Sequence, residues 1–279
     1  SGSLEVCNGS AWVTAGSGSS IDGLSDAFTD YASEHNFIMG RASAAALPSG
    51  AINNTFIGEG AGATTANSTS ATDDNTAIGY YALAGLTTGI ENTAVGVHAL
   101  YANTTGSLNT AMGEYALSSN IDGSDNTAFG ADTLVANTSG ASNTAVGRAA
   151  LNVNVTGVNN TAVGKQAGNS ITTGSGNILL GYDVDTPTAT TSNHLNIGNT
   201  IYGNISTGSV GIGTTSPQST LHVPDGKYAQ FEDSNAGAPP AGDCDNNAER
   251  GRMSIDTTNN RLYICNGATR GWDYVALTD

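Results

Sequence analysis

A short pattern of polar and apolar residues recurs along the middle of the chain at a fixed interval. It first appears as Asn75-Thr76-Ala77-Ile78-Gly79 and returns every 17 residues as far as Asn160–Gly164, with degenerate copies at Asn54–Gly58 and Asn177–Gly181. If the segment is extended, the Thr and the aliphatic residue share one face, and Ala points to the other face, where only a small side chain fits. The period predicts one such strand in each 17-residue coil of a β-solenoid or β-roll.

Two further features repeat with the strands. An Ala-Leu pair such as Ala99-Leu100, replaced by Thr133-Leu134 in one copy, follows most of the strands, and we predict that it forms a second short strand with one large apolar residue per coil. A turn of the form Asn-Thr-x-Gly, as in Asn103–Gly106, follows the pair. The Asn and Gly of the Asn-Thr-Ala-Val-Gly motif accept positive φ at the corners of the coil. Stacked coils would place the repeated Asn side chains in ladders that satisfy backbone and side-chain groups together.

The composition supports this interpretation and excludes several classes of protein. The 279 residues include 37 Gly, only 11% are charged, and the formal net charge is −16. The shortage of large apolar residues and helix formers argues against a helical bundle or a doubly wound nucleotide-binding fold. The acidity argues against a nucleic-acid partner and against adhesion to anionic bilayers. Apolar runs stay well below the ~20 residues of a membrane span, so we expect no membrane insertion.

The sequence offers no constellation that would support catalysis. The His residues do not stand at metal-ligand spacings with one another or with Cys, and the Gly-rich segments are not followed by a phosphate-binding signature. We therefore expect no enzymatic activity, no metal and no cofactor. A glycan-degrading tail spike stays open as an alternative, because paired carboxylates for glycoside hydrolysis have no fixed sequence spacing.

The repeats resemble those of two groups of surface proteins. The Asn-Thr-Ala-Val-Gly repeats resemble the head repeats of trimeric autotransporter adhesins and of phage tail-fibre proteins. The segment Val210–Val223, VGIGTTSPQSTLHV, resembles a junction of tail-fibre-domain proteins. The resemblance implies an extracellular homotrimeric fibre, on a virion or on a bacterial cell, that attaches to a cell-surface glycan or protein receptor. The sequence after the repeats resembles neither the C-terminal intramolecular chaperone nor the membrane anchor of these proteins, so we expect that the chain is not a complete autotransporter.

Both ends of the chain differ from the repeats. Residues from Gly251 onward read as strand, turn, strand, Asn-Gly turn and strand, which predicts a small antiparallel β module. Cys244 and Cys265 are placed for a disulfide in it, which fits an oxidising compartment. Residues 4–13 repeat part of the module, with Cys7 in the slot of Cys265. Cys7 is then free, paired between chains, or separated from its partner by truncation.

The N-terminal copy leaves two hypotheses open. Either the chain begins within a module of a longer fibre, or its N-terminal piece completes a module in another chain and builds a head-to-tail filament with a scaffolding role. The predicted all-β chain then divides into a partial module (1–20), a transition segment that leads into a first coil at Phe56 (21–50), the repeat array (51–200), a neck (201–235) and the C-terminal module (236–279).

Candidate contact residues fall in two places. The two residues after each repeat Gly vary from copy to copy against a fixed frame, so we expect their side chains to be exposed. Binding along the shaft would use aromatic residues at or near these positions, namely Tyr80, Tyr81, Tyr101 and Tyr115. Binding at the tip of the C-terminal module would use Arg270, Trp272 and Tyr274.

Overall fold

The computed structural model describes strands joined by turns and contains no helix among the residues it describes, so the predicted all-β class is confirmed. The described residues are 5–7, 12–14, 36–43, 47, 50–63, 72–224, 253–256, 261–265 and 272–276. The chain divides into two compact units, residues 1–224 and residues 225–279.

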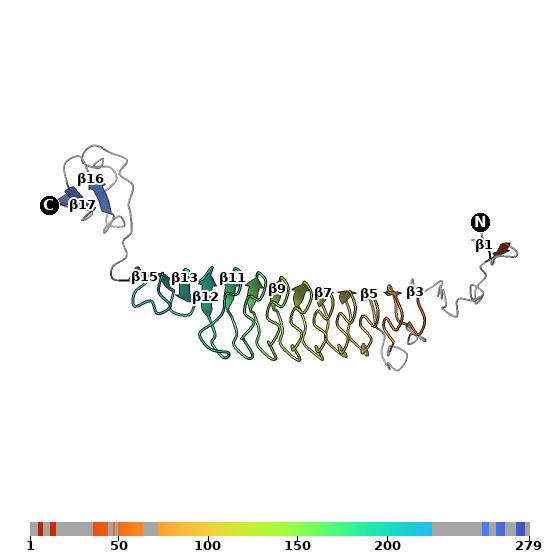
Figure 1. Ribbon diagram of the computed structural model, residues 1–279. Helices are drawn as coiled ribbons and strands as arrows, with labels where there is room; N and C mark the ends of the chain where they lie inside the picture. The colour runs from red at the N-terminus through yellow and green to blue at the C-terminus, as the bar shows by residue number, and fades with distance from the viewer. Residues whose placement is uncertain are drawn as a thin grey trace. The chain divides into compact units, whose positions relative to one another are not determined.

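A single sheet of 13 strands runs through the first unit, and most of its strands come one per coil (Figure 1). Neighbouring strands from β3 to β12 pair in parallel, and their register places equivalent residues side by side, as with Thr93 and Thr110. The predicted solenoid with coils of about 17 residues is therefore confirmed. The strands are β3 (Phe37–Met39), β4 (Thr55–Ile57), β5 (Thr76–Ile78), β6 (Thr93–Val95), β7 (Thr110–Met112), β8 (Thr127–Phe129), β9 (Thr144–Val146), β10 (Thr161–Val163), β11 (Ile178–Leu180) and β12 (His194–Ile197).

The sheet extends beyond the repeats at both ends. The first coil begins at β3 and not at Phe56 as we expected, because Phe37–Met39 already pairs in parallel with β4. After β12 the chain turns back on itself, so β13 (Ile201–Asn204) and β14 (Ser209–Ile212) pair antiparallel. The VGIGTTSP…LHV segment contributes β14 and β15 (Leu221–His222), which pair in parallel, and β15 is the last strand at this edge of the sheet.

The prediction of a second strand at each Ala-Leu pair is wrong. Ala99 and Leu100 lie in a turn, and both are fully buried. A strand would send two consecutive side chains to opposite faces, so the backbone must turn to bury both. Leu100 makes that turn with a φ of 51°, in the left-handed region, and its N–H donates to the Ala116 carbonyl of the next coil at 2.9 Å.

The core is a narrow column of small and medium apolar residues between the strand and this turn. Ala94 at the centre of β6 and Leu100 are both fully buried, and their equivalents repeat in the neighbouring coils. The glycine after each strand lets the coils approach closely. Gly96 has a φ of 134°, and a Cβ built there would lie 2.6 Å from the Gly113 carbonyl oxygen.

The predicted asparagine ladders are confirmed, and the first one precedes the strands. The Asn92 N–H donates to Asn75 Oδ1 at 3.0 Å, and Asn92 Nδ2 donates to Asn75 Oδ1 at 3.1 Å and to the Gly106 carbonyl at 3.0 Å. The bonds to the preceding Asn join each coil to the one before it. The bond to the glycine carbonyl fixes the corner that leads into the next coil. The ladder contains Asn36, Asn54, Asn75, Asn92, Asn109, Asn126, Asn143, Asn160 and Asn177, and the N–H of His194 donates to its last member.

A second, shorter ladder runs through the Asn-containing turns. Asn120 Nδ2 donates to Asn103 Oδ1 at 2.7 Å and to the Gly123 carbonyl at 2.8 Å. The same pattern continues to Asn137 and Asn154. Buried amides are costly unless they are hydrogen-bonded, so the two ladders let this thin core contain many polar groups.

The two antiparallel pieces at the ends of the chain share one register. In the C-terminal unit, β16 (Met253–Asp256), β17 (Arg261–Cys265) and β18 (Trp272–Ala276) form the predicted antiparallel module. Cys265 lies opposite Trp272 in it. In the N-terminal hairpin of β1 (Glu5–Cys7) and β2 (Trp12–Thr14), Cys7 lies opposite Trp12.

Candidate functional site

Five aromatic side chains from three successive coils meet on the surface of the solenoid. We call them the aromatic cluster: Tyr80, Tyr81, His98, Tyr101 and Tyr115. Tyr81, His98 and Tyr115 each stand two residues after the strand glycine, so the coil period stacks them. Hydrogen bonds between coils fix this register, since the His98 N–H donates to the Tyr80 carbonyl at 2.9 Å.

His98 lies at the centre of the cluster. Its ring centroid is 5.0 Å from that of Tyr101, 5.2 Å from that of Tyr115, 5.6 Å from that of Tyr80 and 6.0 Å from that of Tyr81. Tyr80 and Tyr81 contact each other edge to face, with centroids 4.7 Å apart. Each aromatic pair of this kind contributes about 0.5–1.5 kcal/mol of stabilisation. The cluster is therefore a preorganised surface of ring faces and edges.

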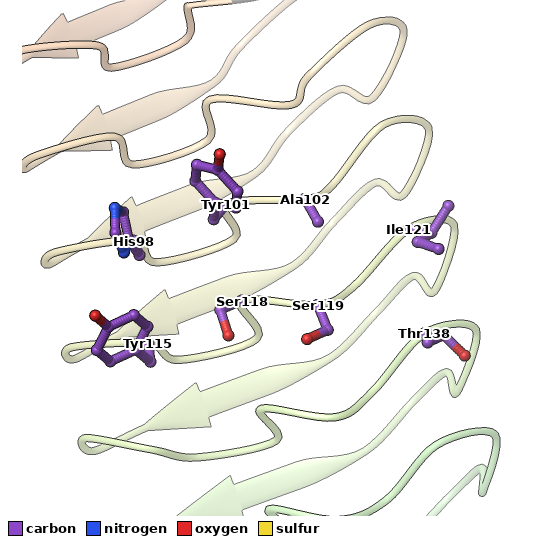
Figure 2. Close-up of a pocket in the computed structure, with 8 residues that line it drawn as sticks. All are labelled: His98, Tyr101, Ala102, Tyr115, Ser118, Ser119, Ile121 and Thr138. Carbon is purple, nitrogen blue, oxygen red and sulfur yellow. The ribbon is translucent and has the colours of Figure 1, made fainter.

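An open groove of about 530 Å³ adjoins the cluster and crosses three coils. Figure 2 shows His98, Tyr101 and Tyr115 near the strand ends of two coils, with Ile121 and Thr138 at the opposite turns. Ala102, Ser118 and Ser119 complete the lining. Among the described residues that line the groove, none carries a carboxylate, an ammonium or a guanidinium group.

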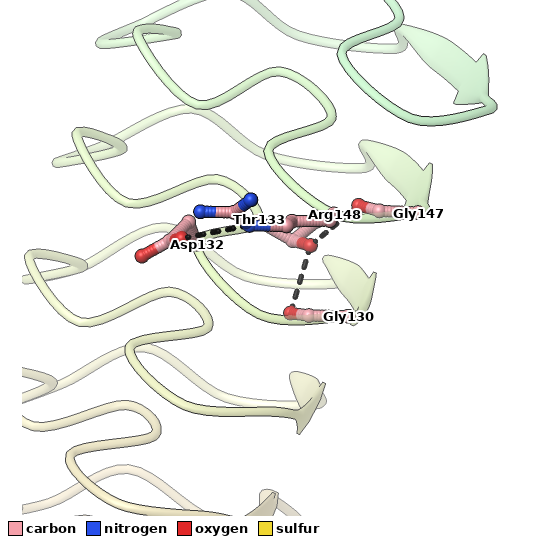
Figure 3. Close-up of polar contacts among 5 residues, drawn as sticks. All are labelled: Gly130, Asp132, Thr133, Gly147 and Arg148. Carbon is pink, nitrogen blue, oxygen red and sulfur yellow. Dashed lines mark hydrogen bonds and ion pairs between the residues drawn. The ribbon is translucent and has the colours of Figure 1, made fainter. Parts of the chain in front are cut away.

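The charged groups near the groove are mostly acidic. Glu114, which precedes Tyr115, and Asp122, which follows Ile121, are both exposed. One coil further on, Asp132 forms an ion pair with Arg148, with 3.5 Å between Oδ2 and Nε (Figure 3). The side chains of Arg148 and Asp132 are exposed by 68% and 40%, so the pair adds little stability.

A buried hydroxyl lies beneath that ion pair. Thr133 stands where neighbouring coils have Ala116 or Ala150, and its Oγ1 lies 2.8 Å from the Gly130 carbonyl and 2.9 Å from the Gly147 carbonyl (Figure 3). In the neighbouring coils the corresponding glycine carbonyl accepts from a backbone N–H, as from Ala116 to Gly113 at 3.3 Å. The hydroxyl therefore replaces a structural hydrogen bond and is not available to a ligand.

A second, more polar groove of about 360 Å³ lies where the repeat array ends. His194 of β12 and Ser209 of β14 line it together with residues of the following loop, including Pro217 and Gln218. His194 is buried, and this burial lowers the pKa of its imidazole below the ordinary value of 6.5. The groove lies where the chain reverses direction after β12, at the end of the sheet. We therefore assign the groove a structural role.

The residues expected along the shaft lie together, and sequence reasoning missed the residue that connects them. Tyr80, Tyr101 and Tyr115 are exposed by 47%, 45% and 39%, and Tyr81 is partly buried. His98 was not among the expected contact residues, although it occupies the same repeat position as Tyr81 and Tyr115. Equal position within the repeat was the signal that could have identified it.

The residues expected at the tip are only partly within the described part of the chain. Tyr274 is 53% exposed, and the Arg261 guanidinium carbon lies 4.3 Å from its ring centroid. Trp272 begins β18, while Arg270 lies outside the described residues. The cation over Tyr274 is thus Arg261, which the sequence did not single out.

The cysteine predictions also fall at the edge of the described residues. Cys244 lies outside them, so its disulfide with Cys265 stays a prediction. Cys7 ends β1, and its three alternatives stay open.

The described residues hold no group of three or more His, Cys, Asp or Glu side chains arranged to bind a metal ion. They also contain no apolar helix of the length that a bilayer crossing requires. Comparison with known proteins found no matching family model, curated protein or solved structure. Function must therefore be argued from the solenoid and its surface.

Proposed function

We propose that this chain is a segment of an extracellular attachment fibre, of the kind found in phage tail fibres or bacterial surface filaments. The observation that carries the proposal is the unbroken register from β3 to β12, in which every strand pairs with the next coil and two asparagine ladders tie the coils together. Stacked coils of this kind form a stiff spacer. The aromatic cluster lies on its side, where a receptor can reach it.

Adhesion of the purified chain to cells tests the attachment role. Beads coated with the chain are expected to adhere saturably to cells that carry the receptor, in a panel of bacterial and animal cells. Beads coated with His98→Ala/Tyr115→Ala are expected to adhere less. Adhesion that is lost on substitution of Tyr274 and kept in the His98→Ala/Tyr115→Ala variant would place the receptor contact on the C-terminal module. Adhesion to no cell type by correctly folded chain would contradict the proposal.

Self-association into a homotrimer is part of the proposal. The third residue of each strand points outward, and the parallel register aligns these residues in an apolar row that includes Ile78, Phe129 and Val163, exposed by 38%, 51% and 40%. A continuous apolar row of this kind favours burial against identical chains. Light scattering is expected to give three times the chain mass. Phe129→Ser should shift it towards the monomer, and Tyr182→Ser, at an exposed site elsewhere, should not.

The proposed location is outside the cell, on a virion or a bacterial surface. A Cys244–Cys265 disulfide would support it, because such bonds persist in oxidising compartments. Peptide mapping without reductant is expected to recover the linked pair from protein isolated from its natural source, and two free thiols there would argue for a reducing location.

A second candidate, a head-to-tail filament with a scaffolding role, is favoured by the shared register of the two ends. Cys7 opposes Trp12 as Cys265 opposes Trp272. Among the described strands, β1 pairs only with β2, whereas β17 pairs on both sides. A strand from another chain could therefore add to β1. Electron microscopy should then show filaments that lengthen with concentration and shorten when residues 1–13 are removed, and particles of fixed length would exclude this candidate.

A further inference from the structure

The coil period places aromatic rings in a row along the direction in which the coils stack. Tyr81, His98 and Tyr115 occupy one position in three successive coils, and the His98 ring lies 6.0 Å and 5.2 Å from its two neighbours, at interplanar angles of 66° and 57°. His98 and Tyr115 are the two that line the groove. Strands in a sheet are spaced by about 4.8 Å, which is close to the advance per sugar ring in an extended polysaccharide. A linear chain of sugars can therefore meet a repeating set of rings as it crosses the coils.

The rest of the groove supplies the polar partners that a sugar requires. Ser118, Ser119 and Thr138 contribute hydroxyl groups to the lining, and Tyr101 adds a phenol. Hydroxyls donate and accept hydrogen bonds, and Thr138 Oγ1 keeps acceptor capacity while it donates to the Val155 carbonyl at 3.2 Å. Aromatic faces beside hydroxyl groups match the apolar faces and polar edges of pyranose rings.

The charges decide which sugars fit. The described lining of the groove lacks a cationic side chain, Glu114 and Asp122 flank it, and the whole chain carries −16. An anionic polymer such as a sulfated or uronic-acid glycan would meet repulsion without a compensating Lys or Arg. Binding of a strongly charged protein surface would require groups of opposite charge in the groove. A lining of aromatic rings and hydroxyl groups instead favours a neutral partner.

We propose that the groove beside the aromatic cluster binds a neutral, linear polysaccharide that lies across the coils. The inference rests on the proposed attachment function and names its ligand class. The chain of sugars stacks on His98 and Tyr115, and its hydroxyl groups bond with Ser118, Ser119 and Thr138. A protein receptor is the alternative that the experiment must separate.

The repeats themselves provide substitutions that the fold accepts. Ala149 occupies the same coil position as His98 and Tyr115, with a φ of 57° against their 54° and 56°. His98→Ala and Tyr115→Ala therefore reproduce a coil that the chain already contains. Tyr182→Ala is the matched control, because Tyr182 is an exposed tyrosine of a distant coil.

Binding of the intact chain is measured on an array of neutral glucans, mannans and chitin oligosaccharides, with heparin and polygalacturonate as anionic probes. We expect a neutral polymer to bind, and we expect the double variant His98→Ala/Tyr115→Ala to bind it at least about tenfold more weakly, since each lost stacking contact contributes about 1 kcal/mol. Tyr182→Ala should bind like the unmodified chain. Binding that is unchanged in the double variant would overturn the assignment of this groove.

The cell-adhesion experiment separates failure of this inference from failure of the attachment function. If the chain adheres to cells but binds no neutral polymer, or only heparin, the attachment function stands and the neutral-glycan inference is overturned. Adhesion that is abolished by protease treatment of the cells and survives periodate treatment has the same meaning. Adhesion abolished by periodate and inhibited by a neutral polymer supports the inference.

Discussion

Asn154 and Ile171 occupy equivalent positions in successive coils, and the second asparagine ladder ends between them. Asn154 Nδ2 donates to Asn137 Oδ1 at 2.9 Å and to the Gly157 carbonyl at 3.1 Å. Its own Oδ1 is buried without a hydrogen-bond partner among the described residues, because the Ile171 side chain has no donor. At the other end of the ladder, Leu86 precedes Asn103 in the equivalent position and is also fully buried.

This relationship predicts that the ladder tolerates an apolar residue at its end and not in its middle. Asn154→Leu removes the unpaired Asn154 Oδ1 and leaves Asn137 Oδ1 unpaired instead, so the number of unpaired oxygens does not change. Asn120→Leu leaves Asn103 Oδ1 unpaired in addition to Asn154 Oδ1. An extra unsatisfied buried acceptor costs about 1–3 kcal/mol, so Asn120→Leu should reduce the free energy of unfolding by that much more than Asn154→Leu. Urea unfolding measures the difference, and equal losses would show that the ladder bonds do not stabilise the coils.

The strand glycines are predicted to be sensitive because the next coil lies against them. In Gly96→Ala the new methyl meets the Gly113 carbonyl oxygen, whereas Gly208, with a φ of 68°, has open space where a Cβ would stand. Both variants share backbone strain, but only Gly96→Ala adds overpacking of about 1–3 kcal/mol. Thermal unfolding should therefore show a larger loss for Gly96→Ala than for Gly208→Ala, and similar losses would contradict the close approach of the coils.

Thr133 is predicted to accept Ala and to resist Val. Thr133→Ala restores the residue of the neighbouring coils, in which a backbone N–H replaces the hydroxyl at the glycine carbonyl, so its effect should stay within about 1 kcal/mol. Thr133→Val keeps the shape but places a methyl against the carbonyls of Gly130 and Gly147, which should cost about 1–3 kcal/mol. Chemical denaturation of both variants compares them, and a Val variant as stable as the Ala variant would argue against hydrogen bonding between the Thr133 hydroxyl and these carbonyls.

His194 is predicted to make the end of the array sensitive to acid. Burial lowers its pKa in the folded state below 6.5, so the folded chain disfavours the protonated form. Stability is therefore fully present above about pH 6.5 and falls as the pH drops through 6.5 towards the lower folded value. Protection factors for amide hydrogen exchange in β11 to β13, which correct for the intrinsic exchange rate at each pH, should fall between pH 7 and pH 5. His194→Asn, which restores the residue of the other coils, should reduce that fall, and an unchanged pH dependence would exclude His194 as its source.

The sequence by itself determined the period, the strand and the ladder. The sequence shows a period of 17 residues and, in each period, a Thr-Ala-apolar triplet preceded by Asn. This pattern sufficed to predict a stack of coils in which Ala77 faces a narrow interior and Asn75 joins its equivalents. These features depend on residues close in sequence and on repetition, so the pattern of one coil predicts all of them. The antiparallel C-terminal module was predictable for the same reason, because its turns are local.

Only the tertiary structure decided what happens between coils and at their ends. Leu100 adopts a positive φ because Ala99 and Leu100 must both reach the same core, a demand that strand propensity does not contain. His98 joins four tyrosines because stacking brings residues 17 positions apart into contact. Neighbours across coils are set by the register of the stack and by how closely the glycines allow it to pack, so the groove that we assign to a glycan appears only when the coils are assembled.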